Sequence, residues 1–205
     1  MLLLPLLSCS LAGETPQVHE FTTQADDSCA ASISPLLADD PRATGGAVLI
    51  ADKSARRIGL YQHGSLATLD GAPACWRMAL APNSPPGTKQ REGDRATPEG
   101  WYRTSDKPAS QFPLAIAVHY PNELDAAAGL AAGRIDAATD AAIRAAIRAD
   151  RKPPQNTALG GEILIHGGGA VSDWTLGCLA MDDADLTRLR AALPAGMRTD
   201  LLILP

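Results

Sequence analysis

The stretch IHGGGAVSDWTLGC, residues 165–178, decides how the chain is interpreted. It places one histidine, His166, and one cysteine, Cys178, twelve positions apart, with glycine beside both of them. Such a pair can be a catalytic couple, half of a metal site, or two core residues near tight turns. Which of these applies depends on what the rest of the chain supplies.

Composition limits the class of protein. With 205 residues, 45% of them hydrophobic, the chain can bury one core and form a compact catalytic domain with a short leader. The formal charge is −5, the basic residues are scattered, and only 4% of residues are aromatic, so a nucleic-acid partner is not expected. No apolar run approaches the roughly 18 residues of a transmembrane helix.

The N-terminal part divides into two expected segments. Residues 1–13 resemble an export signal or lipoprotein leader, although they lack a positively charged start. Cys9 sits where a lipoprotein would carry its lipid, which would be the only membrane attachment; a plain signal with an incidental cysteine is the alternative. Either leader predicts export to the periplasm or cell envelope. Residues 14–45 are polar and proline-punctuated, which is typical of a linker and N-terminal decoration, with a possible helix over 29–37.

The remaining cysteines allow two interpretations. Without Cys9, three are left, Cys29, Cys75 and Cys178, which is an odd number. In an exported protein, Cys29 and Cys75 can form a disulfide that leaves Cys178 as the single free thiol. The alternative is that Cys29 and Cys75 are small buried hydrophobic residues.

Residues 46–205 read as one domain that is rich in short strands. Alternating or buried apolar runs bounded by turns predict strands over 47–51, 55–61, 75–81, 101–103, 112–120, 161–166 and 198–205. Apolar positions on one face predict a helix over 135–147, and a second helix begins near Asp182 or Asp183, whose carboxylates can cap it. Glycine and proline make residues 81–100 a long ordered loop of the kind that lines a site.

The chemistry of the pair favours catalysis. Cysteine attacks a carbonyl as the thiolate, so it needs a neighbour that accepts its proton, and histidine at a strand end can serve. The glycines allow sharp turns, and two backbone amides aimed at one point would form an oxyanion hole. A lone histidine or a lone cysteine is usually structural. Zinc would need more ligands than His166 and Cys178, and the other histidines lack ligand-like spacing, so we expect no metal.

Three motifs in order resemble the YkuD-type L,D-transpeptidase catalytic domain. They are DRATPEG (94–100), IHG (165–167) and DWTLGC (173–178), the last typical of a branch with a DWT-x-GC loop. The resemblance spans about residues 47–204. It implies a mainly β fold with α decorations, a YkuD-like β-sandwich that holds the catalytic cysteine in a cleft. It implies no cofactor.

The resemblance also assigns roles. Cys178 would be the nucleophile and His166 the general base, with the amides of Gly177 and Cys178 holding the oxyanion. Two positions depart from the family: Leu176 replaces a histidine common in the loop, and Ala180 replaces an arginine often found two residues after the cysteine. Both losses remove polar groups expected near a substrate carboxylate, which puts substrate details in doubt.

Five further residues are candidates for substrate contact. Thr175 falls where the family has serine or threonine, and Gly167 follows the histidine. Trp174 could form the floor of the substrate cleft or pack against the loop. Tyr120 could line the edge of the cleft or pack in the core. Arg95, with Lys89, could meet substrate carboxylates or be a solvated loop charge.

The family implies acyl transfer on peptidoglycan stem peptides through a thioester. We therefore expect a cysteine L,D-transpeptidase. An L,D-carboxypeptidase or peptidoglycan amidase of the same fold, a non-catalytic cell-wall binding module, and a thiol acyltransferase acting on other amides are the alternatives. Nothing in the sequence indicates the oligomeric state.

Overall fold

The computed structural model describes residues 29–193, 196 and 198–205. The predicted leader over residues 1–13, with Cys9, and the first half of the predicted linker lie outside these described residues. None of the helices in the described part of the chain is long and apolar enough to cross a bilayer.

Short strands account for most of the regular structure. They are β1 (Val48–Asp52), β2 (Arg57–Gln62), β3 (Ser65–Leu66), β4 (Thr68–Leu69), β5 (Ala72–Pro73), β6 (Cys75–Arg77), β7 (Gly100–Asp106), β8 (Ile116–Val118), β9 (Leu164–His166), β10 (Leu179–Ala180) and β11 (Asp200–Leu204). The helices are η1 (Pro35–Leu37), α1 (Pro41–Thr44), α2 (Glu123–Ala131), α3 (Ala137–Arg148) and α4 (Asp183–Ala192). The predicted mainly β class with α decorations is confirmed.

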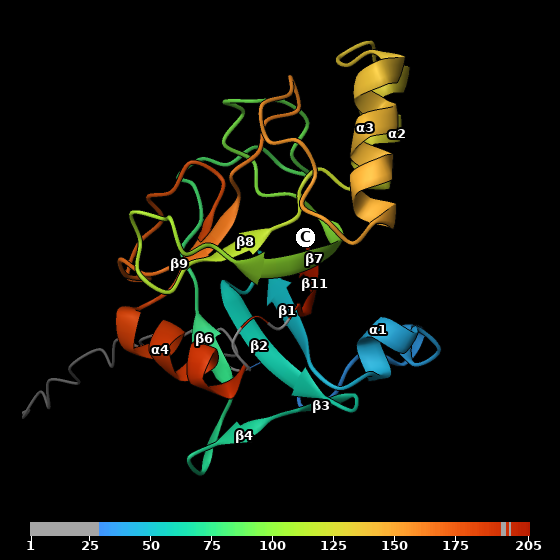
Figure 1. Ribbon diagram of the computed structural model, residues 1–205. Helices are drawn as coiled ribbons and strands as arrows, with labels where there is room; N and C mark the ends of the chain where they lie inside the picture. Colours follow the sequence, from blue (N-terminus) through green and yellow to red (C-terminus); the bar gives the residue numbers. More distant parts are fainter. Residues whose placement is uncertain (1–28, 194–195, 197) are drawn as a thin grey trace, which may run out of the picture.

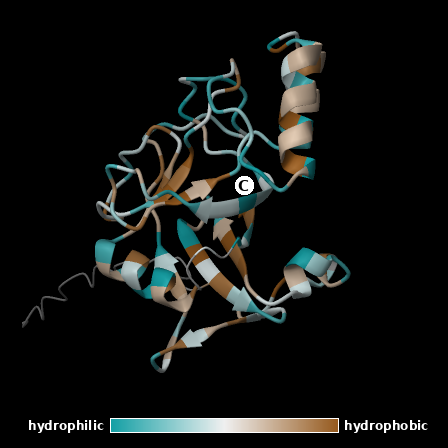
Figure 2. Cartoon of the chain, in the orientation of Figure 1, coloured by the Kyte–Doolittle hydropathy of each residue, from teal (hydrophilic) through white to brown (hydrophobic). Residues whose placement is uncertain are grey.

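One curled sheet organises the molecule (Figure 1). Its strands follow the order β10-β9-β8-β7-β11-β1-β2-β3, and β6 also pairs with β2. β1 runs parallel to β11 and antiparallel to β2, so the last strand of the chain lies beside the first. Figure 2 shows the hydrophobic colour concentrated on the central strands, as expected for strands whose faces are covered.

The two ends of this sheet meet beside the residues of interest. After β6 the chain reaches Ala79, whose N–H and C=O exchange hydrogen bonds with Ala180 of β10 at 2.8 and 2.9 Å. This bridge joins the far edge of the sheet to the β6 side. It ties the segment that follows Cys178 to a strand end about a hundred residues earlier in the sequence.

Two stacked helices, α2 and α3, stand beside the sheet (Figure 1). The predicted helix over 135–147 is confirmed as α3, which Asp136 caps by accepting from the Thr139 N–H at 2.8 Å. The sequence reading missed α2. Its signal was present: Asn122 accepts from the N–H of Asp125, and the Asp125 side chain accepts from the N–H of Asn122, which is a capping box.

The described N-terminal segment is attached covalently. Cys29 and Cys75 form a disulfide across 46 positions, which decides between the two interpretations of these cysteines. The predicted helix over 29–37 is wrong: only the one-turn helix η1 forms there, because proline and serine interrupt the short apolar run.

Most predicted strands are confirmed, with changed boundaries. The strand predicted over 75–81 ends at Arg77, and the one predicted over 112–120 shrinks to Ile116–Val118. By contrast, β7 extends to Asp106. These errors fall where a strand pairs over only part of its apolar run, which the sequence alone does not reveal.

Candidate active site

His166 and Cys178 lie at the ends of two adjacent parallel strands, β9 and β10. His166 ends β9, and Cys178 immediately precedes β10, whose Ala180 is the register partner of His166. Side chains alternate along a strand, so Cys178, two positions before Ala180, faces the same side of the sheet as His166. The two residues of the predicted pair therefore face the same side of the sheet, at the two ends of a long loop over residues 167–177.

The His166 ring is fixed in one tautomer. Its Nδ1 lies 2.6 Å from the Gly167 carbonyl oxygen. Because a carbonyl oxygen can only accept, Nδ1 must carry the proton, which leaves Nε2 as the free base. The ring is 2% exposed, stacks on Phe112 at 4.0 Å between centroids, and meets the edge of Trp174 at 5.4 Å.

The Cys178 thiol is half-buried in an apolar patch. It packs with Phe112 against the buried side chains of Ala115, Ala117 and Leu164. The thiol donates to the Glu162 carbonyl oxygen at 3.6 Å. Phe112 thus contacts both the imidazole of His166 and the apolar patch that holds the Cys178 sulfur.

Burial shifts the pKa values of Cys178 and His166 in the directions that disfavour a thiolate–imidazolium ion pair. Desolvation raises the pKa of the Cys178 thiol, against a hydrogen bond from the Leu164 backbone and the charge of Lys89, which lower it. Desolvation also lowers the pKa of His166. Both shifts favour the uncharged forms, a neutral thiol and a neutral imidazole, at neutral pH.

The loop between the two residues is held at many points. Gly168 and Gly169 adopt φ of 110° and 104°, which side chains disfavour, and the Trp174 indole donates to the Gly169 carbonyl at 3.0 Å. Asp183 accepts from the Gly168 N–H at 2.8 Å. Asp182 accepts from the loop N–H of residue 170 rather than capping α4, which corrects the predicted side-chain cap.

Asp173 anchors the loop to the opposite side of the sheet. Its carboxylate accepts from Arg56 at 2.8 Å and from the Leu80 N–H at 2.8 Å. The Leu80 carbonyl in turn accepts from the N–H groups of Trp174 and Thr175. Arg56 is not predicted from the sequence, because its partner lies 117 positions away and no local pattern links them.

Two buried threonines hold the backbone on both sides of the cysteine. The Thr97 hydroxyl donates to the Gly177 carbonyl at 3.0 Å, and the Thr175 hydroxyl donates to the Cys178 carbonyl at 2.9 Å. The Gly177 N–H donates to Thr175 Oγ1 at 3.3 Å, so this half of the predicted oxyanion hole is already engaged within the loop.

Gly177 must be glycine. Its φ is +124°, and a Cβ there would lie 2.8 Å from the Ala96 carbonyl oxygen. Both the backbone conformation and the close approach of the neighbouring loop exclude a side chain.

A family model for the L,D-transpeptidase catalytic domain, YkuD, matches residues 46–201. The chain belongs to the YkuD family. No curated protein sequence matches it.

Solved structures of similar fold include three bacterial proteins. The helical cell shape determining protein Pgp2 of Campylobacter jejuni, as its K307A mutant, is 20% identical with a TM-score of 0.51, over 82% of this chain and 51% of that one. Bd1075 of Bdellovibrio bacteriovorus is 18% identical with a TM-score of 0.44, over 85% and 51%. An L,D-transpeptidase of Mycobacterium tuberculosis is 12% identical with a TM-score of 0.41, over 78% and 58%.

The chain matches about half of the length of the first of these structures. At these identities the likeness concerns the fold, and the YkuD fold expectation is confirmed.

The two departures from the YkuD pattern differ in their surroundings. Ala180 is fully buried and packs with Ala79 and Ala170 at the bridge that joins the sheet ends. An arginine would not fit there without displacing these neighbours. Leu176, by contrast, is 72% exposed, so packing places no demand on its side chain.

The remaining predicted contacts divide between surface and core. Trp174 is partly exposed beside His166, and Arg95 is exposed at φ +60°. Thr175 and Gly167 are buried, so they shape the loop and present no open surface. Tyr120 is corrected: it is fully buried, and its hydroxyl donates to the Leu159 carbonyl at 3.1 Å, which makes it a core residue.

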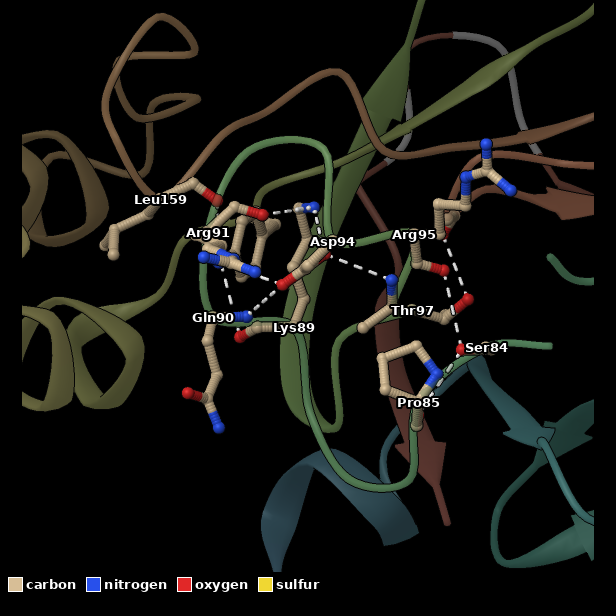
Figure 3. Close-up of polar contacts among 12 residues, drawn as sticks. Ser84, Pro85, Lys89, Gln90, Arg91, Asp94, Arg95, Thr97 and Leu159 are labelled. Atoms are coloured by element: carbon tan, nitrogen blue, oxygen red, sulfur yellow. Dashed lines mark hydrogen bonds and ion pairs between the residues drawn. The ribbon is translucent and has the colours of Figure 1, made fainter.

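Lys89 is buried within the predicted loop over 81–100 and holds it by an ion pair with Asp94 (Figure 3). Its ammonium group is 4% exposed and pairs with Asp94 at 2.8 Å. The same carboxylate accepts from the N–H groups of Gln90, Arg91 and Ala96, so the loop turns around Asp94. Lys89 is therefore a structural ion-pair residue, and the solvated-charge interpretation is wrong for it.

Within the described residues, no three histidine, cysteine or acidic side chains converge as a metal site would require.

Proposed function

We propose that the chain is an exported cysteine L,D-transpeptidase that acts on peptidoglycan stem peptides through a thioester. The observation that supports this most directly is the fixed Nδ1–H tautomer of His166, on the same sheet face as the one free thiol in the described chain, Cys178. A neutral imidazole that offers Nε2 beside a neutral thiol is suited to general-base activation of a nucleophile.

The steps follow from these two side chains. The thiol rotates from the Glu162 carbonyl toward His166, its proton passes to Nε2, and the sulfur attacks the carbonyl carbon of the L-centre of a stem diaminopimelate. The tetrahedral intermediate collapses, the C–N bond breaks, and the D-amino acid leaves with the proton from Nε2. An amine of a second stem then attacks the thioester and gives a proton to Nε2, the C–S bond breaks, and the sulfur takes that proton to become the thiol again.

Water in place of the amine would make the enzyme an L,D-carboxypeptidase or amidase with the same acyl-enzyme. Export to the periplasm or cell envelope, with a lipid on Cys9 as the only membrane attachment, completes the proposal. The substrate is the only partner that it requires.

The test is incubation with defined disaccharide-tetrapeptide stems, followed by mass spectrometry of both protein and products. We expect an acyl adduct on Cys178 and either cross-linked dimers or tripeptides that lack the terminal D-residue. Cys178→Ala should abolish both, and His166→Gln should lower the rate by about 100-fold or more, as expected for loss of a general base.

His63→Ala is the matched control, because His63 is an exposed turn residue and should leave the rate unchanged. Cell-wall binding without any adduct or product would favour the non-catalytic binding module. Turnover that survives Cys178→Ala would exclude the thioester route.

A further inference from the structure

The peptide group between Gly177 and Cys178 is held from one side only. The Gly177 carbonyl accepts from Thr97 Oγ1 at 3.0 Å. A trans peptide is planar, and its C=O and N–H point in opposite directions. Fixing the Gly177 carbonyl therefore also fixes the direction of the Cys178 N–H, which points away from Thr97. Within residues 29–193, this N–H donates to no protein acceptor.

Thr97 is well placed to hold this peptide rigidly. Its side chain is fully buried, and its own carbonyl accepts from the Lys53 ammonium group at 3.5 Å. The preceding residue, Ala96, donates its N–H to Asp94 at 3.0 Å. The contacts with Lys53 and Asp94 thus hold the loop that carries Thr97, and this loop in turn holds the Gly177 carbonyl.

The backbone on the other side of the cysteine is also fixed. Thr175 Oγ1 donates to the Cys178 carbonyl at 2.9 Å and accepts the Gly177 N–H at 3.3 Å. The Gly177 N–H is therefore occupied, and the Cys178 N–H is the amide next to the sulfur that is left to bind a ligand oxygen.

We propose that Thr97 is a positioning residue that fixes the Gly177–Cys178 peptide so that the Cys178 N–H donates to the oxyanion formed when the sulfur attacks a carbonyl. This role rests on the proposed function, because it requires carbonyl attack by Cys178. A preorganised donor stabilises the developing negative charge without reorganising during the reaction. Without the Thr97 hydroxyl, the Gly177–Cys178 peptide is free to tilt, and the Cys178 N–H no longer points at the oxyanion.

The experiment compares two reactions of the same thiol in the full chain. Acylation by p-nitrophenyl acetate passes through an oxyanion, whereas alkylation by iodoacetamide displaces iodide and forms none. Thr97→Val keeps the shape of the side chain and removes the hydroxyl. We expect acylation to fall about 10- to 100-fold, a part of the effect of deleting an oxyanion-hole donor, while alkylation stays within about twofold.

Matched variants separate positioning from general stability. Thr104 is 2% exposed, and its hydroxyl donates to the Thr199 carbonyl at 2.8 Å and accepts from the Thr199 N–H at 3.3 Å, so Thr104→Val removes the hydrogen bonds of a buried threonine elsewhere in the fold. It should leave both rates unchanged. Thr97→Ser should recover most of the acylation, and Cys178→Ala gives the background of both reactions. If the valine variant does not fold, Thr97→Ala should show the same selective loss.

Two results would overturn the role of Thr97: equal losses in acylation and alkylation, or acylation that Thr97→Val leaves unchanged. If the unaltered protein is not acylated above the Cys178→Ala background, the proposed function fails, and the role of Thr97 fails with it. If the unaltered protein is acylated, only the role of Thr97 is in question.

Discussion

Asp125 makes the stability of this protein depend on pH in a measurable way. The carboxylate is partly buried in the capping box of α2, where one oxygen accepts from the Tyr102 hydroxyl and from the Asn122 N–H, both at 2.9 Å. Desolvation nevertheless raises the pKa of Asp125 from 3.8 to about 6. The variant Asp125→Asn keeps an oxygen for both donors and removes the titration.

The sign and size follow from linkage. The folded state binds the Asp125 proton more tightly than the unfolded state, so the stabilisation is complete below pH 3.8 and is lost as pH rises through about 6. At about 1.4 kcal/mol for each pKa unit, the full change is about 3 kcal/mol. From about pH 4.5 to about pH 7.5, the free energy of unfolding of Asp125→Asn should gain about 2 kcal/mol on that of the unaltered protein.

Urea denaturation at several pH values gives the free energies of unfolding of Asp125→Asn and of the unaltered protein. The difference between the two cancels the contribution of every other titrating group. Asp136→Asn is the matched control, because Asp136 caps α3 and its pKa is lowered below 3.8 by hydrogen bonds to Thr139. The difference in free energy of unfolding between Asp136→Asn and the unaltered protein should stay constant over the same pH range. A flat or shrinking difference for Asp125→Asn would refute the desolvation argument.

Three further outcomes follow. Gly177→Ala should lower the free energy of unfolding by about 2 kcal/mol or more in urea denaturation, because it strains a left-handed φ and drives a Cβ against a backbone carbonyl. Burial lowers the pKa of His119 from 6.5 to about 4, so its stabilisation is present above pH 6.5 and is lost as pH falls toward 4, by about 3 kcal/mol in all; denaturation of His119→Gln should lack this slope. Cys178 should react with iodoacetamide more slowly at neutral pH than an exposed cysteine in a peptide, because burial raises its pKa, and faster alkylation would contradict the neutral resting pair.

The sequence predicts His166 and Cys178 as candidate reacting side chains because their signal is local. Glycines beside His166 and Cys178, together with the order of the motifs, predicted a pair that the register of β9 and β10 brings onto one face. The helix α3 was found for the same reason, since its apolar face repeats within a few residues.

What surrounds the pair could not be found in this way. The contacts of Asp173 with Arg56 and of Thr97 with Gly177 join residues 117 and 80 positions apart. A threonine or an arginine carries no mark of such a partner, and only the folded chain sets the pairing. The pKa of Cys178 is also a property of the folded chain, because it depends on how deeply the sulfur is buried.

The two departures from the family pattern therefore have different meanings. Ala180 is fully buried and forms the bridge with Ala79 that joins the two ends of the sheet. The fold therefore requires a small side chain at this position, and a larger polar one would disrupt the bridge. Leu176 meets no such condition, because most of its side chain is exposed on the loop next to Gly177. Packing therefore accounts for the alanine at 180, whereas nothing in the fold requires the leucine at 176.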